Sequence, residues 1–160
     1  MIDISALTKY SAAITSPAVA FDWIIALSWD DGLATPSASG TYYFSGQNKN
    51  LDVFCHGNIT SFGSIQESID LIKSKAATSD LDFSLSNDWA NSSGKLSAEL
   101  FGGAKYFHNR NAKVYQWVSG VVALAEMPVI YNGRIKEIQH NNSEVFITLE
   151  KLLPSYLRNE

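Results

Sequence analysis

Cysteine and histidine are scarce: the 160 residues include one cysteine, Cys55, and three histidines. A single cysteine excludes an intramolecular disulfide, and with it the small secreted domains that disulfides hold together. With so few thiol and imidazole groups, a structural zinc site with four protein ligands is not expected either. The sequence therefore predicts a protein without a metal or any other cofactor.

Long apolar runs are also missing. The two longest candidates, residues 21–29 and 118–129, are interrupted by Asp22 and Glu126, and both are shorter than the roughly 18 apolar residues of a membrane-spanning helix. Residues 1–5 lack the basic start and the apolar core of a signal peptide. We therefore expect no membrane partner, and a protein that stays in a cytosol or leaves a cell without a secretory signal.

Charge is low and slightly negative. Charged residues make up 18% of the sequence, and 12 basic against 16 acidic residues give a formal net charge of −4. This balance argues against nucleic acid as the main partner. Hydrophobic residues at 46% and aromatic residues at 12% predict one folded domain, and many aromatics with few charges are typical of surfaces that contact other proteins.

Alternation of apolar and polar residues predicts mostly β structure. Large apolar side chains occupy every second position from Phe21 to Trp29, which predicts a strand with one buried face. A bulge near Gly133 would turn both Ile135 and Ile138 toward the core. Further strands are predicted at residues 41–44, 51–55, 81–85, 113–118, 129–139 and 144–152, of which the last two form a C-terminal hairpin.

One segment of the sequence is ambiguous, and another predicts a helix. Residues 64–74 fit either a strand or a helix; we prefer the strand, because residues 81–85 alternate cleanly and Lys75–Asp80 would then join the two as a hairpin loop. Residues 92–103 predict a short helix, capped by a serine and ended at Gly102 in the left-handed conformation. The predicted fold class is mostly β: an antiparallel β-sandwich or small barrel with one short helix, forming a single domain at 1–152 with a C-terminal tail at 153–160.

No familiar catalytic or phosphate-binding motif occurs in the sequence. Asp30, Asp31 and His56 are the candidate groups for a small hydrolase, but two aspartates and a glycine after a strand are more typical of a turn. Cys55 and His56 are neighbours on a predicted strand, so their side chains point to opposite faces and cannot pair as nucleophile and base. We therefore expect that the protein is not an enzyme.

The candidate functional residues are contact residues instead. Tyr106, Phe107 and Arg110 lie in a segment that mixes aromatic and basic residues, which we expect to contact an acidic partner surface rather than a single-stranded nucleic acid. Trp89 lies in a polar loop, where an exposed indole would require a partner.

Polar loops are further contact candidates, because binding residues gather on surface loops. They contribute Asn48, from residues 45–50, and Lys75, from residues 75–80. A different hypothesis is a carbohydrate-binding β-sandwich whose aromatic rings stack on sugars. The candidate rings for that role are Trp89, Tyr42 and Tyr106.

The order of elements resembles a family of bacteriophage tail-tip and baseplate proteins. The similarity is to their N-terminal hub-like domain, which is related to the hub protein of gene-transfer-agent particles. It covers about residues 4–152, and its most telling part is Gly133-Arg134-Ile135 followed by a short hairpin and Ile147-Thr148-Leu149-Glu150. The other segments that carry it are residues 4–10, 21–29, 42–44, 57–62, 65–71, 80–87 and 114–117.

The resemblance implies a structural virion component that sits in a ring at the tail tip. Its partners would be copies of itself and other tail or baseplate proteins, and it would be assembled in the host cytoplasm before residing in the virion tail. Larger members of the family carry a C-terminal extension whose cysteines hold an iron–sulfur cluster. This sequence ends at Glu160 with Cys55 alone, so the cluster is not carried over, and both a hub and a neighbouring adaptor position stay open.

Overall fold

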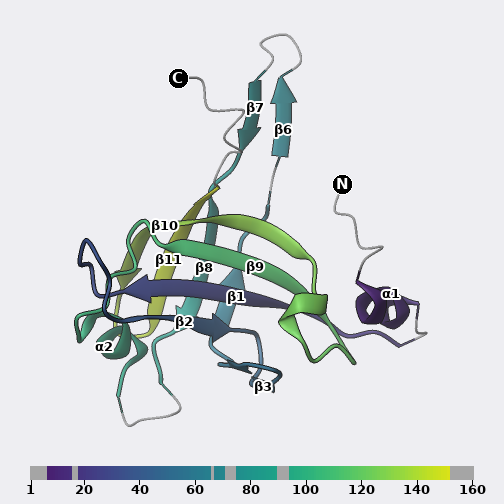
Figure 1. The fold of residues 1–160 in the computed structure, drawn as a ribbon, viewed down its shortest axis with the longest axis horizontal. Coiled ribbons are helices and arrows are strands. Elements are labelled where there is room, and N and C mark those ends of the chain that lie inside the picture. The colour runs from purple at the N-terminus through teal and green to yellow at the C-terminus, as the bar shows by residue number, and fades with distance from the viewer. Residues whose placement is uncertain (1–6, 16–17, 66, 71–74, 90–93, 152–160) are drawn as a thin grey trace.

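The computed structural model describes residues 7–15, 18–65, 67–70, 75–89 and 94–151. Within this part of the chain, seven strands form one antiparallel sheet in the order β2-β1-β9-β10-β11-β8-β5 (Figure 1). In that order, the strands are β2 (Ser39–Phe44), β1 (Phe21–Asp30), β9 (Asn111–Val118), β10 (Val129–His140), β11 (Glu144–Lys151), β8 (Leu81–Ser86) and β5 (Ile59–Phe62). The predicted C-terminal hairpin is confirmed as β10 and β11, while the predicted tail at 153–160 lies outside the described residues.

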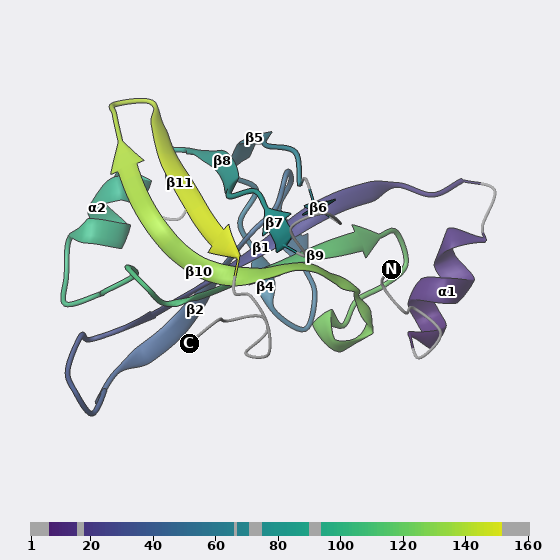
Figure 2. The same cartoon turned by 90° about the horizontal axis from the view of Figure 1, so that it is seen from above.

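The sheet curls until its two ends meet. Figure 2 shows the strong bend of β10. At the meeting point the amide of Ile59, the first residue of β5, donates to the carbonyl oxygen of Ser45, just after β2, at 3.1 Å. The ring of Trp23 in β1 stacks on Phe62 in β5, with 5.1 Å between the ring centroids. The predicted class, a mostly β sandwich or small barrel, is confirmed as a curled half-barrel.

Strand β1 is buried on both faces at its centre. Ile25 and Leu27 point into the main core inside the curl, and both are fully buried. Ile24, on the other face, is also fully buried and belongs to a second core. The prediction of a single buried face was wrong here, because three other segments cover the outer face. These are helix α1 (Thr8–Ile14), the 3₁₀ turn η1 (Leu124–Glu126) and the hairpin of β3 (Lys49–Asn50) and β4 (Phe54–Cys55).

The predicted hairpin of residues 64–74 with residues 81–85 was wrong. Strand β6 (Glu67–Asp70) pairs with β7 (Lys75–Thr78) in a separate hairpin, so residues 75–78 are strand rather than loop. This hairpin projects from the body of the sheet (Figure 1). Strand β8 pairs instead with β11 and β5. Residues 51–55, predicted as one strand, form the turn and second strand of the β3–β4 hairpin. Alternation shows where a strand forms, but the choice of partner depends on distant residues.

The predicted bulge exists, three residues beyond its expected place. The register between β10 and β11 shifts between Ile135 and Glu137, so the extra residue is Lys136. Ile135 is fully buried and Ile138 packs against the main core, as expected. Gly133 keeps regular partners on both sides.

The predicted short helix is α2 (Leu96–Phe101). It has no capping side chain at Lys95, where it begins, and Gly102 ends it at φ −83°, so the predicted serine cap and left-handed glycine were wrong. A Cβ at Gly102 would lie 2.1 Å from the carbonyl oxygen of Ala98, which explains the glycine by close approach instead. Helix α1 was not predicted; its Tyr10 is buried in the second core.

Candidate functional site

A groove of about 600 Å³ opens between the segment that ends α2 and strand β10. We call it the Tyr106 groove. Its walls come from a helix end, a loop and a bulged strand that are distant in the sequence. It is lined by Phe101, Lys105, Tyr106, Phe107, His108, Ile135, Lys136, Glu137 and Ile138.

Tyr106 is held at the groove by the end of β1. Its amide donates to the carbonyl oxygen of Asp30 at 2.7 Å, and its carbonyl oxygen accepts from the amide of Asp30 at 3.2 Å. The tyrosine ring lies over Gly32, where a Cβ would approach the ring to 2.5 Å and where φ is +71°. The backbone of Tyr106 is therefore fixed, while its side chain remains 57% exposed.

Phe101 forms the opposite apolar wall. It is the last residue of α2, it is 45% exposed, and its ring lies 5.0 Å from that of His140. Ile138, turned toward the core by the bulge, lies between these walls and is partly buried. Large exposed aromatic side chains beside a hollow are the usual anchors of protein–protein contacts.

Both lysines that line the groove are paired within the chain. Lys105 bonds to a Glu99 carboxylate oxygen at 2.6 Å and donates to the Tyr42 hydroxyl at 2.7 Å. The bond from Lys105 holds the pKa of Glu99 below its usual value. Lys136 bonds to Asp80 at 2.6 Å. These pairs reduce the charge that the groove presents, so its recognition surface is largely apolar.

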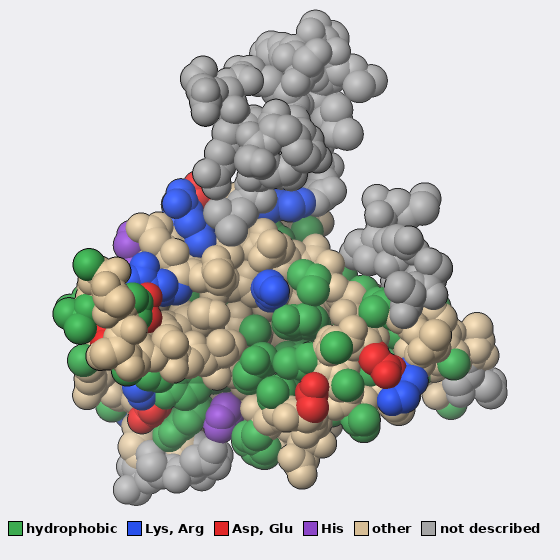
Figure 3. All heavy atoms as spheres, in the orientation of Figure 1, with side chains coloured by type: hydrophobic (Ala, Val, Ile, Leu, Met, Phe, Trp, Pro, Cys, Tyr) green, Lys and Arg blue, Asp and Glu red, His purple; other side chains and the backbone are tan. Residues whose placement is uncertain are grey.

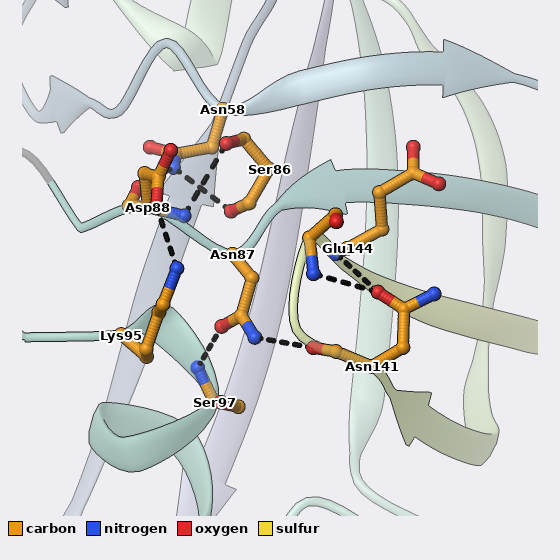
Figure 4. A network of polar contacts seen from close by, with 9 residues as sticks. Asn58, Ser86, Asn87, Asp88, Lys95, Ser97, Asn141 and Glu144 are labelled. Carbon is orange, nitrogen blue, oxygen red and sulfur yellow. Dashed lines mark hydrogen bonds and ion pairs between the residues drawn. The ribbon is translucent and has the colours of Figure 1, made fainter.

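Asn87, directly after β8, ties the start of α2 to the turn between β10 and β11 (Figure 4). This side chain is 1% exposed. Its Oδ1 accepts from the amide of Ser97 at 2.8 Å, and its Nδ2 donates to the carbonyl oxygen of Asn141 at 2.6 Å. Asn87 thus provides the cap that α2 lacks and fixes the helix against the turn between β10 and β11, which positions Phe101.

Trp89 lies elsewhere, in an aromatic cluster. Its ring is 4.4 Å from that of His56 and 6.2 Å, edge to face, from that of Tyr42. The indole is partly buried and packs against the main core, so it is not the freely exposed ring that would require a partner. Of the three rings considered for sugar stacking, only Tyr106 is exposed, and the three do not form one open row.

The remaining predicted contact residues fall in three places. Phe107 and Arg110 share one turn, where the Arg110 amide donates to the Phe107 carbonyl oxygen at 3.0 Å, while Asn48 lies in a surface loop and Lys75 in β7. Phe107 is 5% exposed and belongs to the main core, and it is also among the residues that line the Tyr106 groove. Arg110 is paired with Asp30, and its Nη2 donates to Oδ1 at 2.8 Å. Asn48 is on the surface, where its Oδ1 accepts from the Gly57 amide at 2.7 Å. Lys75 lies in β7, and its side chain is outside what the structure describes.

The three candidate hydrolase groups do not converge. Asp30 bonds to Arg110, which lowers the pKa of its carboxyl group. The Ser37 hydroxyl holds the pKa of Asp31 at about 2. His56 bridges to Phe44, at the end of β2 away from Asp30, roughly 17 Å along the strand. Burial lowers the pKa of His56.

Two features are absent from the described part of the chain. No group of three or more His, Cys, Asp or Glu side chains there is arranged to hold a metal ion. None of the helices in that part of the chain is long and apolar enough to cross a membrane.

Phe101 and Ile138 line the groove, but the sequence did not single them out as contact residues. Phe101 was part of the predicted helix and Ile138 of the predicted bulged strand, but neither was considered for contact. The signal for Phe101 was a large aromatic residue beside Gly102 and Gly103 at a helix end. The convergence of both with Tyr106 depends on tertiary packing.

These features define a mostly β protein whose Tyr106 groove presents an apolar and aromatic surface. Its fold is similar to that of a chain in the virion of a native gene transfer agent particle, with a TM-score of 0.53 and 14% sequence identity. The likeness covers 94% of this chain and 46% of that one, so the chain spans about half the length of its structural relative. At this identity the likeness is one of fold. No protein-family model and no curated protein matches the sequence.

Proposed function

We propose that this protein is a structural component of a phage-like virion and acts through protein–protein contacts. It would sit in the tail tip or baseplate as a hub or adaptor ring subunit, after assembly in the host cytoplasm. The observation that carries the proposal is the fold likeness to a gene transfer agent virion chain over 94% of the residues. The protein would carry out no reaction of its own.

The surface of the molecule supports such a role. A closed ring joins two different surfaces of each subunit, repeated by rotation. The Tyr106 groove offers an apolar surface with two exposed aromatic side chains, and the β6–β7 hairpin projects from the body of the sheet (Figure 1). The partners would be copies of this chain and other tail or baseplate proteins, with the groove as a main contact.

Co-expression with the proteins encoded by neighbouring genes tests this proposal. We expect light scattering after size-exclusion chromatography to detect a complex with a defined number of copies. Tyr106→Glu should reduce the yield of that complex about tenfold or more, because it places a charge in the contact. The matched control is Val122→Glu, at a similarly exposed apolar residue, 55% against 57%, that does not line the groove.

A chain that stays monomeric beside every neighbouring protein would contradict the virion role. Equal loss of the complex in both variants would contradict the role of the groove. Circular dichroism of each variant separates a failure to assemble from a failure to fold.

A further inference from the structure

The outer face of the sheet is covered only in part. The second core, around Ile24, is closed by α1, η1 and the β3–β4 hairpin. The rest of that face bears polar side chains of β2, β1 and β9, as the period of two along each strand requires. Figure 3 shows the protein in the orientation of Figure 1, with charged side chains sparse in the middle of the visible face.

A hollow of about 190 Å³ lies among these polar side chains, and we call it the Lys113 hollow. Ala26 in β1 pairs with Tyr43 in β2 on one side and with Lys113 in β9 on the other. The small side chain of Ala26 thus lies between the long side chains of Tyr43 and Lys113, and this difference in size leaves a depression in the surface. The full lining is Ala26, Ser28, Thr41, Tyr43, Asn111, Lys113 and Tyr115.

Lys113 is unusual among the basic residues. Seven described lysines and arginines form ion pairs with carboxylates: Lys9, Lys49, Lys95, Lys105, Arg110, Arg134 and Lys136. Lys113 forms none within the described residues, and no carboxylate is among the described residues that line its hollow. A lone cation in such a setting favours an anionic ligand.

The other polar groups of the hollow are suited to hydroxyl groups of a ligand. Within the described residues, the side chains of Tyr43, Asn111 and Tyr115 have no hydrogen-bond partner. Ser28 and Thr41 are 3.4 Å apart through their hydroxyl oxygens, at the limit of a hydrogen bond. Burial raises the pKa of Tyr115, so its phenol is protonated near neutral pH and can donate. The site thus offers hydroxyl, phenol and amide groups next to one cation.

We propose that the Lys113 hollow binds a hexuronic acid residue of an acidic polysaccharide. The sugar carboxylate pairs with Lys113, while its ring hydroxyls bond to Asn111 and to the hydroxyls of Ser28 and Thr41. The volume equals that of about six water molecules at ~30 Å³ each, which suits a sugar ring. An acidic side chain of a protein would satisfy Lys113 and leave the hydroxyl groups to water.

Titration of the ¹⁵N-labelled protein at constant ionic strength tests the proposal. The probes are sodium glucuronate, glucose and sodium acetate. We expect glucuronate to shift the amide resonances of residues 26–28, 41–43 and 111–115, with an affinity at least about tenfold above that of either other probe. Equal binding of acetate, equal binding of glucose, or no shift with glucuronate would each overturn the proposal.

Two variants locate the interaction. Lys113→Gln keeps a polar side chain but removes the charge, and it should weaken glucuronate binding about tenfold. Ser28→Val fills the hollow with a residue that suits a strand, and it should abolish binding. Lys95→Gln, at a lysine that is 51% exposed in a loop, is the matched control and should bind as the wild type does. Unchanged binding in Lys113→Gln would overturn the assignment.

Discussion

At the scale of single residues, Asn87 shows how one side chain connects distant parts of the fold. It is almost fully buried, and both ends of its amide are used, one toward α2 and one toward the turn at Asn141 (Figure 4). Nothing in the local pattern marks it, because Asn87 lies in a polar loop whose residues resemble those of any turn. Its partners are ten and 54 residues away in the sequence.

Asn87→Ala should lower the free energy of unfolding by about 1–3 kcal/mol, because it leaves the buried amide of Ser97 and the carbonyl oxygen of Asn141 without these partners. Asn87→Asp keeps an acceptor for Ser97 but faces the Asn141 carbonyl oxygen with a carboxylate, so it should be destabilising as well. Urea denaturation followed by circular dichroism measures both.

The control for these variants is Asn142→Ala, at an exposed residue of the turn between β10 and β11. It should change stability by less than about 0.5 kcal/mol. An Asn87→Ala protein as stable as this control would show that the cap does not hold α2.

At the scale of elements, β10 combines a bulge with a close approach between strands. The bulge at Lys136 was predicted from the spacing of Ile135 and Ile138, but it was placed at Gly133 because glycine often marks such irregularities. The structure gives this glycine another role. A Cβ at Gly133 would lie 2.4 Å from the carbonyl oxygen of Glu150 and 2.7 Å from the ring of Tyr131.

Gly133→Ala should therefore lower the free energy of unfolding by about 1–3 kcal/mol, because strand β11 or the buried Tyr131 ring must move. Thermal and urea unfolding measure the change. Gly103→Ala is the matched control, because a Cβ there would meet nothing within 4 Å, and it should stay within about 1 kcal/mol of the wild type. Equal stability of the two variants would contradict the close packing at Gly133.

At the scale of the whole molecule, one sheet supports two cores. Ile24 and Ile25 are neighbours on β1, both fully buried, and they point into different clusters. Because the same strand carries both, neither core can lose its packing without disturbing the other. We therefore expect the described domain to unfold in a single transition.

Ile24→Ala and Ile25→Ala should each lower the free energy of unfolding by about 2–5 kcal/mol, since each removes buried methyl groups and leaves a cavity. In both variants, circular dichroism and tryptophan fluorescence should report the same midpoint. Separate transitions in Ile24→Ala would show that the second core is an independent unit. Val122→Ala, at an exposed residue, is the control.

The candidate site was predictable only in part. Tyr106 was identified because an aromatic residue in a basic loop suggests contact, and it does line the groove. Phe107, its neighbour, carried the same signal and is buried, because adjacent residues of an extended segment face opposite ways. Pairing of Arg110 with Asp30 joins residues that are 80 positions apart, which no local pattern records.

By itself, the sequence determined that the protein is mostly β, where β1 and the C-terminal hairpin lie, and that no disulfide can form within the chain. Those properties depend on composition and on the period of two along a strand, and both are local. Only the tertiary structure decided that β8 pairs with β11, that part of the outer face of β1 is covered, and that Phe101, Tyr106 and Ile138 meet in one groove. These outcomes depend on how a curled sheet brings distant residues together. The free energy that favours them therefore comes from the packing of the whole fold and not from any local segment.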